Sequence, residues 1–465
     1  MSASGRDLPS SATRGDLTYP AALAAIEARG RFGVRLGLGR VRALLGAMGD
    51  PQLAVRGALV GGTNGKGSVI ALAGSALRAA GYRVGQTPKP HLVTYRERIV
   101  VDGRPITPDD FARLVSETIP VADRVARRLG EPTEFELLTA VMFRHFAEVG
   151  PDVALVEVGL GGRLDATHAW DGGVAVITNV GLDHTDRLGP TVSAIAHEKA
   201  AIIERADRAV TGAAGEALAI VRRRCARLGV PLAVVSPAPV LGWTRDTVTV
   251  DLPRLGPTSI GLRGRHQAAN VATADALLDA LEAAGIATVG VAARRDGYAS
   301  ARWPGRLELL QVAVPGHGTR EVLLDGAHNP DGAAALAVAL DDLRPYLAGG
   351  GASPEPVTLV WASMRDKDVA GVVEAVARSS ALAGATVVCT AVDLPRAMPP
   401  EELAAAWRAG LPASTVMTAP GPDAALDVAL ALGLGPLVVA GSLYLVGAAR
   451  ARLVDDPALR DPVPA

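Results

Sequence analysis

The segment Gly57–Val69, GALVGGTNGKGSV, decides the fold of the amino-terminal part of the chain. Residues 57–60 are apolar and predict a strand, and residues 68–80 predict a helix that stops at Gly81. Glycines between a strand and a helix let backbone N–H groups approach phosphate oxygens, and the helix amino terminus adds partial positive charge. The residues expected to hold a nucleotide here are Gly62, Thr63, Asn64, Gly65, Lys66, Gly67 and Ser68.

The lysine and the hydroxyl of this loop have separate tasks. Lys66 can reach the outer phosphates, and the hydroxyl of Ser68 can ligate Mg²⁺. The spacing departs from the general pattern G-x-x-x-x-G-K-[ST], because Gly67 separates Lys66 from Ser68. A glycine-rich turn without a ligand is the alternative, but strand, lysine, hydroxyl and helix follow one another in the order that a phosphate site needs.

Composition and charge narrow the class of protein. The 465 residues include 47 Lys and Arg and 48 Asp and Glu, so the formal net charge is −1. A generic nucleic-acid binder needs a basic surplus, so we expect no nucleic-acid partner. No run of 18 apolar residues predicts a membrane span, and the first residues lack the apolar core of a signal peptide. We therefore expect a soluble cytoplasmic enzyme without a membrane partner, in which Cys225 and Cys389 only pack.

Short apolar runs alternate with alanine-rich helical stretches, which predicts an α/β fold. The run 153–158 suits a parallel strand covered on both faces, whereas 240–262 alternates with period two and predicts an antiparallel excursion. We expect a disordered tail at 1–18, a P-loop ATPase domain with a mostly parallel sheet at 19–300, and a Rossmann-like domain at 301–465. The strands expected in the last domain are 320–325, 357–362, 385–392, 414–418 and 436–440.

Three further residues are candidates for binding metal or phosphate because of their positions in the sequence. Glu157 ends a buried-type strand, at the edge where such folds bind ligands, and its carboxylate suits Mg²⁺; a helix-capping or ion-paired glutamate is the alternative. Arg306 lies at the expected domain junction, where it could reach over the phosphates or form an interdomain ion pair. His184 lies in a polar loop, and by itself it would be interpreted as a surface or core histidine.

Several motifs, taken in their order along the chain, resemble those of one enzyme family. GTNGKGS (62–68) with its additional glycine, LVEVGLGGRLDATH (155–168), ITNVGLDH (177–184) and LLDGAHN (323–329) resemble the folylpolyglutamate synthase/dihydrofolate synthase branch of the Mur ligase superfamily. The segments HEKAAI, RHQAAN, WPGRLE and ASMRDKD agree with the same branch. The resemblance covers roughly residues 30–450.

The resemblance implies an activity. Members of this branch join L-glutamate to a pterin-linked carboxylate through an acyl phosphate and release ADP and phosphate from ATP. The acceptor would be dihydropteroate, a reduced folate, or both. Two Mg²⁺ ions would assist, together with Lys199 carbamylated on its amine. No interface is needed to complete such a site, so we expect a monomer.

The resemblance also assigns roles to single residues. Asn270 would touch the nucleotide base, and Arg306, Asp325 and His328 would contact ATP from the second domain. The expected metal ligands are Ser68, Glu157, His184 and Lys199 in its carbamylated form. The expected catalytic residues are Lys66, Lys199, Arg306 and His328.

Lys89 stands where family members usually carry a serine that contributes to a magnesium site. A protonated lysine cannot ligate Mg²⁺, so Lys89 could contact phosphate directly, replace part of the charge of the metal, or be a loop variant with water completing the metal shell. From the family pattern, Lys89→Ser is expected to retain or raise Mg²⁺-dependent turnover, and a large loss would indicate a direct role for Lys89. His168 for the asparagine of its motif and Ala201 for a glycine are smaller departures, and a paralogue with an altered acid substrate stays open.

Alternatives from other classes are weighed against the ligase. Within the ligases, a monofunctional folylpolyglutamate synthase or a relative acting on a non-folate acid stays open. A P-loop switch or motor NTPase would not need Glu157 and Lys199, nor Arg306 from a second domain. A dinucleotide-dependent oxidoreductase is disfavoured, because no G-x-G-x-x-G follows the first expected strand of the second domain.

Overall fold

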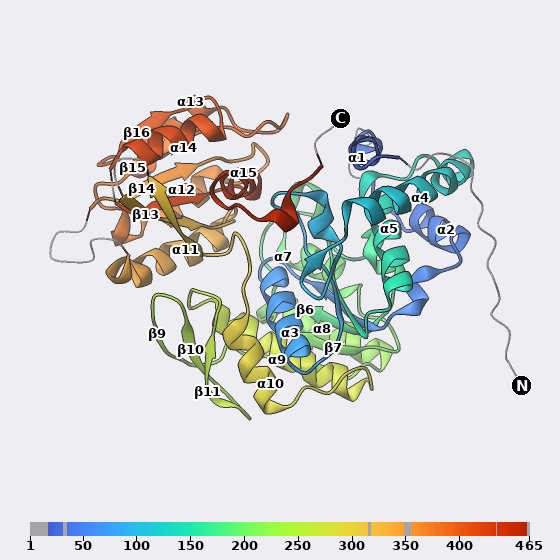
Figure 1. Ribbon diagram of the computed structural model, residues 1–465. Coiled ribbons are helices and arrows are strands. Elements are labelled where there is room, and N and C mark those ends of the chain that lie inside the picture. Colours follow the sequence, from blue (N-terminus) through green and yellow to red (C-terminus); the bar gives the residue numbers. More distant parts are fainter. Residues whose placement is uncertain (1–16, 31–34, 315–317, 348–354, 434, 463–465) are drawn as a thin grey trace, which may run out of the picture.

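Figure 1 shows the computed structural model, whose first sheet has eight strands in the order β4-β3-β2-β5-β1-β6-β7-β8. The six strands from β2 onward in this order run parallel, which confirms the mostly parallel sheet, and β3 and β4 add an antiparallel edge. The structure describes residues 17–30, 35–314, 318–347, 355–433 and 435–462. The strand bounds are β1 Gly57–Gly61, β2 Val84–Thr87, β3 Val100–Val101, β4 Arg104–Pro105, β5 Val153–Glu157, β6 Gly173–Ile177, β7 Arg208–Thr211 and β8 Leu232–Val234.

Helices cover both faces of this sheet, which explains the uninterrupted apolar runs of its central strands. In β1, Leu59 packs into one hydrophobic core, and Ala58 and Val60 pack into the other. The first core lies against α1, α2, α4, α5, α7 and α8, and the second lies against α3, α9 and α10. The helix bounds are α1 Tyr19–Glu27, α2 Gly39–Ala47, α3 Lys66–Ala79, α4 Pro108–Leu129, α5 Glu134–Val149, α6 Thr185–Leu188, α7 Val192–Ala200, α8 Gly215–Leu228, α9 Gln267–Ala283 and α10 Val291–Ser300.

The antiparallel excursion predicted at 240–262 is confirmed as a three-stranded sheet in the order β11-β10-β9. Its strands are β9 Val240–Trp243, β10 Val248–Leu252 and β11 Gly256–Ile260. Every second residue of β10 is buried in the core that also covers α9, so the period-two pattern reflects one packed face and one wet face.

A second sheet, in the order β12-β13-β17-β14-β15-β16, carries the carboxy-terminal part of the chain. The five strands predicted there are confirmed and run parallel, with α11 to α13 on one face and α14 and α15 on the other. These elements are β13 Gly318–Leu324, β14 Thr358–Trp361, β15 Thr386–Cys389, β16 Thr415–Thr418, β17 Leu437–Ala440, α11 Pro330–Leu343, α12 Val369–Ala377, α13 Pro400–Gly410, α14 Pro422–Ala431 and α15 Leu443–Leu453.

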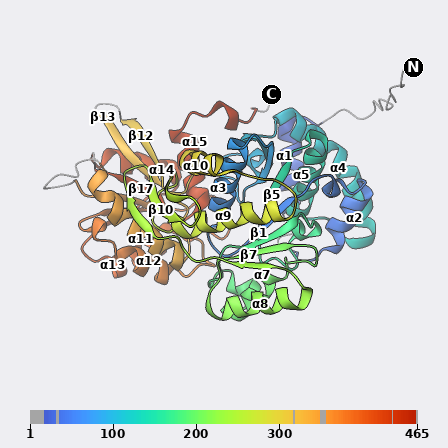
Figure 2. The same cartoon turned by 90° about the horizontal axis from the view of Figure 1, so that it is seen from below.

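One strand of the second sheet was not predicted. Strand β12, Glu308–Val314, pairs antiparallel with β13 at the edge of the sheet (Figure 2). Its side chains are all partly or fully exposed, so it lacks the buried apolar signature of a central strand. This segment forms a strand because it pairs with β13, and that pairing is a tertiary contact.

The first sheet with its helices and the three-stranded sheet is called the first unit, and the second sheet with its helices the second unit. A carboxy-terminal segment runs from α15 of the second unit back to the first unit (Figure 1). There the guanidinium of buried Arg96 donates to the carboxylate of Asp461 at 3.0 Å and to the carbonyls of Ala458 and Arg460 at 2.9 and 3.0 Å. The hydroxyl of Thr94 donates to the same carboxylate at 2.8 Å. The loop that follows β2 is therefore tied to the end of the chain.

The predicted boundaries are only partly visible. The chain passes from α10 to β12 between Ser300 and Glu308, and the domain boundary near residue 300 stays a prediction. The tail predicted at 1–18 lies, up to residue 16, outside the described residues, and the backbone N–H of Leu17 donates to Ser116 Oγ. Within the described ranges, no helix has both the length and the apolar character that crossing a membrane requires.

Candidate active site

A cavity of about 950 Å³ lies where the carboxyl ends of the two parallel sheets meet. Residues that follow the adjacent strands β5, β1 and β6 line it, together with residues that follow β13, β17 and β14. Ligands bind at this edge of open α/β sheets. The structure brings all the predicted site residues together on this cavity: Gly62, Thr63, Asn64, Gly65, Lys66, Gly67, Ser68, Glu157, His184, Lys199, Asn270, Arg306, Asp325 and His328.

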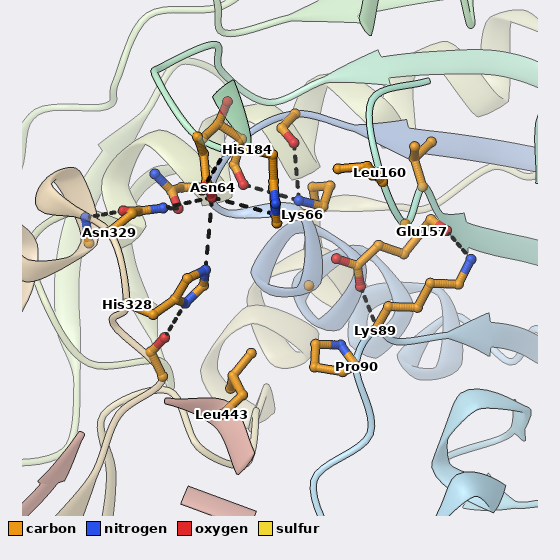
Figure 3. A pocket seen from close by; sticks show the side chains of 18 of the residues that line it. Asn64, Lys66, Lys89, Pro90, Glu157, Leu160, His184, His328, Asn329 and Leu443 are labelled. Atoms are coloured by element: carbon orange, nitrogen blue, oxygen red, sulfur yellow. Dashed lines mark hydrogen bonds and ion pairs between the residues drawn. The ribbon is translucent and has the colours of Figure 1, made fainter. Parts of the chain in front are cut away.

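The phosphate loop presents its lysine at the start of α3 (Figure 3). The Lys66 ammonium donates to the carbonyls of Gly62 and Thr63, both at 3.0 Å, which leaves one of its three N–H groups for a ligand. Burial lowers the pKa of Lys66, although the carboxylates of Glu157 and Asp183 act in the opposite direction. No carboxylate of the described residues lies within ion-pair distance of this ammonium, so a bound phosphate would be its direct anionic partner.

Two glycines of the loop are required because other side chains press against them. Gly65 has a φ of +81°, and a Cβ there would lie 2.2 Å from Asn270 Oδ1. A Cβ on Gly67 would lie 2.8 Å from the indole ring of Trp303. The additional glycine of the motif therefore gives Trp303 room against the loop, and Asn270 reaches the loop from α9.

Gly65→Ala is expected to weaken ADP binding at least about tenfold. An alanine Cβ at Gly65 would clash with Asn270 and shift the N–H groups of the phosphate loop. Losing one hydrogen bond to a charged phosphate costs about 1.5–3 kcal/mol, and about 1.4 kcal/mol corresponds to a factor of ten. Calorimetric titration with ADP measures the effect. Gly81→Ala is the matched control, because Gly81 has a φ of +89° but no neighbouring atom within 4 Å. It should lower thermal stability and leave ADP affinity unchanged; equal ADP affinities for the two variants would refute this account.

Glu157 ends β5 and is only 4% exposed. Its Oε2 accepts a hydrogen bond of 2.9 Å from the backbone N–H of Lys89. Burial raises the pKa of Glu157, while Lys66 and Lys89 act to lower it. The carboxylate is therefore held at the cavity wall by the backbone, close to several cations.

The ammonium of Lys89 does not lie on this carboxylate. Its Nζ donates to the main-chain oxygen of Glu157 at 2.7 Å and lies 4.3 Å from the centroid of the Phe135 ring. Figure 3 shows the side chain running past Glu157 towards that carbonyl. Burial lowers the pKa of Lys89 to about 8.

Lys199 lies on α7 with 5% of its surface exposed. Its ammonium donates to the carbonyl of Gly62 at 2.9 Å, so α7 contacts the phosphate loop directly. Burial and the nearby charge of Lys66 lower the pKa of Lys199 to about 7. Among the described residues, no carboxylate lies within ion-pair distance of this ammonium.

Asp183 joins the two units, and the sequence analysis did not select it. Its carboxylate lies 2.6 Å from the ammonium of Lys367 and accepts from Asn329 at 3.2 Å. Asn329 also donates to Asn64 of the phosphate loop at 3.1 Å (Figure 3). Burial would raise the pKa of Asp183, but interactions with His184 and Lys367 outweigh it and hold that pKa well below its usual range. A signal was present, since Asp183 precedes His184 directly and Lys367 lies in the quoted ASMRDKD segment.

The second unit contributes an arginine, an acid and a histidine. Burial lowers the pKa of Arg306, against the attraction of Asp325 and Glu157. Asp325 is anchored by the backbone N–H groups of Leu307 and Ala327, both at 2.9 Å. His328 Nδ1 lies 2.7 Å from the carbonyl of Gly326, and burial lowers its pKa to about 4, so it is neutral at pH 7. A cation and a neutral ring therefore face the phosphate loop across the cavity.

The side chains of the cavity could supply some, but not all, of the ligands of a Mg²⁺ ion. Among the described residues, no group of three His, Cys, Asp or Glu side chains could hold a metal ion alone. Mg²⁺ commonly takes one or two protein ligands and completes its shell with water and phosphate oxygens. The Ser68 hydroxyl and the Glu157 carboxylate are such hard oxygen donors, and both line the cavity.

Two family profiles match the chain: the Mur ligase middle domain at residues 60–278 and the Mur ligase glutamate ligase domain at residues 305–443. The dihydrofolate synthase/folylpolyglutamate synthase of Bacillus subtilis is 35% identical over 359 residues, which are 75% of this chain and 80% of that protein. The chain belongs to the folylpolyglutamate synthase/dihydrofolate synthase family of Mur ligases. The resemblance inferred from the motifs is thereby confirmed.

Solved structures of this family superpose on the whole fold. The folylpolyglutamate synthase of Mycobacterium tuberculosis complexed with ADP and AMPPCP is 32% identical with a TM-score of 0.81, covering 94% of this chain and 100% of that one. Escherichia coli FolC in complex with DHPP and ADP is 29% identical with a TM-score of 0.76, covering 93% and 97%. The two-unit arrangement is therefore shared with folylpolyglutamate synthases that bind nucleotides.

Two of the departures from the family motifs lie apart from the cavity lining. His168 pairs with Glu204 at 3.3 Å and approaches the carbonyl of Arg163. Ala201 ends α7. Neither residue lines the cavity, whereas Lys89 does. Among the three departures from the folylpolyglutamate synthase pattern, Lys89 is therefore the one placed to act on a substrate.

Proposed function

We propose that the protein uses ATP to join L-glutamate to pterin-linked carboxylic acids, forming dihydrofolate from dihydropteroate and lengthening the glutamate tail of reduced folates. Family membership supports ATP-dependent ligation. The observation that carries the proposal is one cavity that needs both units: the phosphate loop from the first, and Arg306, Asp325 and His328 from the second. A P-loop switch protein would have no use for the second set.

The chemistry follows from the poor leaving group of a carboxylic acid. A carboxylate oxygen of the acceptor attacks the γ-phosphorus of ATP, the bond from that phosphorus to the bridging oxygen breaks, and ADP leaves. The glutamate amine then attacks the acyl carbon of the acyl phosphate, phosphate leaves, and the amine loses its proton. Lys66 and Arg306 would stabilise the charge on the transferred phosphoryl group.

The contacts between the units would shield this intermediate from water. Asn329 and Lys367 of the second unit bind Asn64 and Asp183 of the first. An acyl phosphate hydrolyses readily, so a site closed over it favours attack by the glutamate amine. The same contacts would hold the acceptor acid and glutamate in line with each other.

Mg²⁺ belongs to the proposal through Ser68, Glu157 and His184, with two ions implied by the family resemblance. When bound, Mg²⁺ would neutralise charge on the phosphate oxygens. Burial lowers the pKa of His184, which keeps its ring neutral and able to act as a ligand.

Lys199 is expected to take up CO₂ as a carbamate. Its amine nitrogen forms a bond to the carbon of CO₂ and loses one proton, while the remaining N–H can still donate to the carbonyl of Gly62. Only the neutral amine reacts, so labelling by ¹³C-bicarbonate should rise as pH increases through about 7, the pKa of Lys199. Carbon-13 NMR measures the carbamate signal, which should be lost in Lys199→Met. A signal that persists in this variant, or none in the unaltered protein, contradicts the prediction.

Release of ADP tests the function as a whole. Purified protein with Mg-ATP and L-glutamate is assayed with dihydropteroate, with tetrahydrofolate, and without an acceptor. Turnover with both acids supports the bifunctional enzyme, and turnover with one acid assigns a single step. ADP release that does not depend on glutamate would contradict the ligase.

Three parts of the proposal rest on the sequence alone. A monofunctional folylpolyglutamate synthase, or a relative acting on a non-folate acid, is the alternative that the acceptor comparison decides. The monomeric state is tested by sedimentation. The cytoplasmic location stays a prediction.

A further inference from the structure

Lys89 places an ammonium on the cavity wall without a carboxylate partner. It follows β2, and within the described residues its Nζ donates one hydrogen bond, to the main-chain oxygen of Glu157 at 2.7 Å. The ring of Phe135 lies 4.3 Å away on another side. An ammonium has three N–H groups, so two remain for a further partner. A partly buried cation without a counter-ion is costly, and an anionic ligand would offset that cost.

Three other cations of the cavity are paired with carboxylates. Arg98 lies 3.9 Å from Glu134, Lys367 lies 2.6 Å from Asp183, and Arg396 lies 3.2 Å from Asp366. Lys66 and Lys199 donate to carbonyls of the phosphate loop. Arg306, whose guanidinium donates to the carbonyl of Gly305, also lacks a carboxylate at ion-pair distance and is assigned to the nucleotide. Apart from these three nucleotide-side cations, Lys89 is the partly buried cation that, within the described part of the chain, has no carboxylate at ion-pair distance.

The surroundings of this ammonium are apolar on one side. The ring of Phe135 lies against it, and Leu160 and Leu164 line the same cavity. An aromatic acid meets both conditions, because its ring can lie on apolar side chains while its carboxylate reaches the ammonium. A phosphate group has no apolar part that could pack on Phe135, and the loop expected to bind phosphate lies at the start of α3.

We propose that the Lys89 ammonium binds a carboxylate of the acceptor acid and thereby selects acidic acceptors. This rests on the proposed function, since the acceptor is the pterin-linked acid. The position of the ammonium also argues against Lys89 replacing the charge of a metal ion. Its charged end contacts the carbonyl of Glu157, whereas the backbone N–H of Lys89 occupies one carboxylate oxygen.

A cycle that alters both protein and ligand tests this contact. The probes are pteroate and its carboxamide, which differ only in the charged group, and binding is measured by fluorescence titration without ATP. In the unaltered protein, the carboxamide should bind about 10- to 100-fold more weakly than the acid. In Lys89→Met this ratio should fall to within a factor of about three, because the acid loses its partner and the amide loses little.

A structural role gives a different result. If Lys89 only supports the main chain of Glu157, Lys89→Met weakens the acid and the amide equally and the ratio persists, which overturns the proposal. Arg35→Met is the matched control, because Arg35 lines the same cavity but is exposed. Its ratio should stay that of the unaltered protein; an equal drop in both variants would indicate a general effect of charge and would also overturn the proposal.

The binding test is separable from the proposed function. If the unaltered protein binds neither pteroate nor the amide and shows no glutamate-dependent ADP release with dihydropteroate or tetrahydrofolate, the folate function fails, and the Lys89 proposal fails with it. If turnover occurs and pteroate binds, but the acid-to-amide ratio is near one in the unaltered protein, the function stands and the Lys89 proposal alone is wrong.

Discussion

Lys66→Met is expected to lower turnover about a thousand-fold without lowering the free energy of unfolding. Two of the three N–H groups of Lys66 are taken by the carbonyls of Gly62 and Thr63, and the third is left for the transferred phosphoryl group. Charge that develops on phosphate oxygens is stabilised most strongly where water is excluded. Burial lowers the pKa of Lys66, so the fold disfavours its charged form, and an apolar side chain removes that cost.

Single-turnover ADP release and a urea unfolding curve measure the two effects on the same preparation. Lys66→Arg keeps the charge but changes its shape, because a planar guanidinium cannot reproduce the two carbonyl contacts of an ammonium. Its turnover should therefore lie between those of the other two proteins. Near-normal turnover in a folded Lys66→Met protein would show that the loop lysine does not act on phosphate.

The ion pair between Asp183 and Lys367 carries the second large effect. Asp183→Asn is expected to lower kcat/KM about a hundredfold, because Lys367 loses a carboxylate at 2.6 Å while only 9% of its side chain is exposed. Burying the unpaired charge of Lys367 raises the free energy of the closed arrangement of the two units. The variant therefore favours their separation. Lys367→Met leaves the carboxylate unpaired instead and should cost a similar amount.

The double variant shows whether the pair acts as a unit. If it does, Asp183→Asn combined with Lys367→Met loses little more activity than either single change. Values of kcat/KM for the four proteins complete the cycle. Arg245→Met is the matched control, because Arg245 binds Glu321 across the same two units but outside the cavity. Losses that add in the double variant would mean that the two residues act separately.

Local sequence was sufficient for the parts of the site that depend on one strand and one turn. The segment from Gly57 to Val69 predicts strand, loop and helix, since the positions of its glycines and apolar residues restrict the backbone directly. Glu157 could be placed for the same reason, because a polar residue at the end of an apolar strand reaches the ligand-binding edge of the sheet. The family motifs supplied Lys199 and Asn270, which the pattern alone would not have selected.

Contacts between distant segments could not be derived in this way. Asp183 meets a lysine 184 positions later, and Asn64 meets an asparagine 265 positions later. Strand β12 depends on β13 for its pairing, and the direction of the Lys89 side chain depends on Glu157 and Phe135. The sequence by itself determined the phosphate loop, the acid beside it and the two parallel sheets, since local backbone preference and uninterrupted apolar runs specify them. Only the tertiary structure decided which charges pair across the cavity, because that depends on how the two sheets face each other.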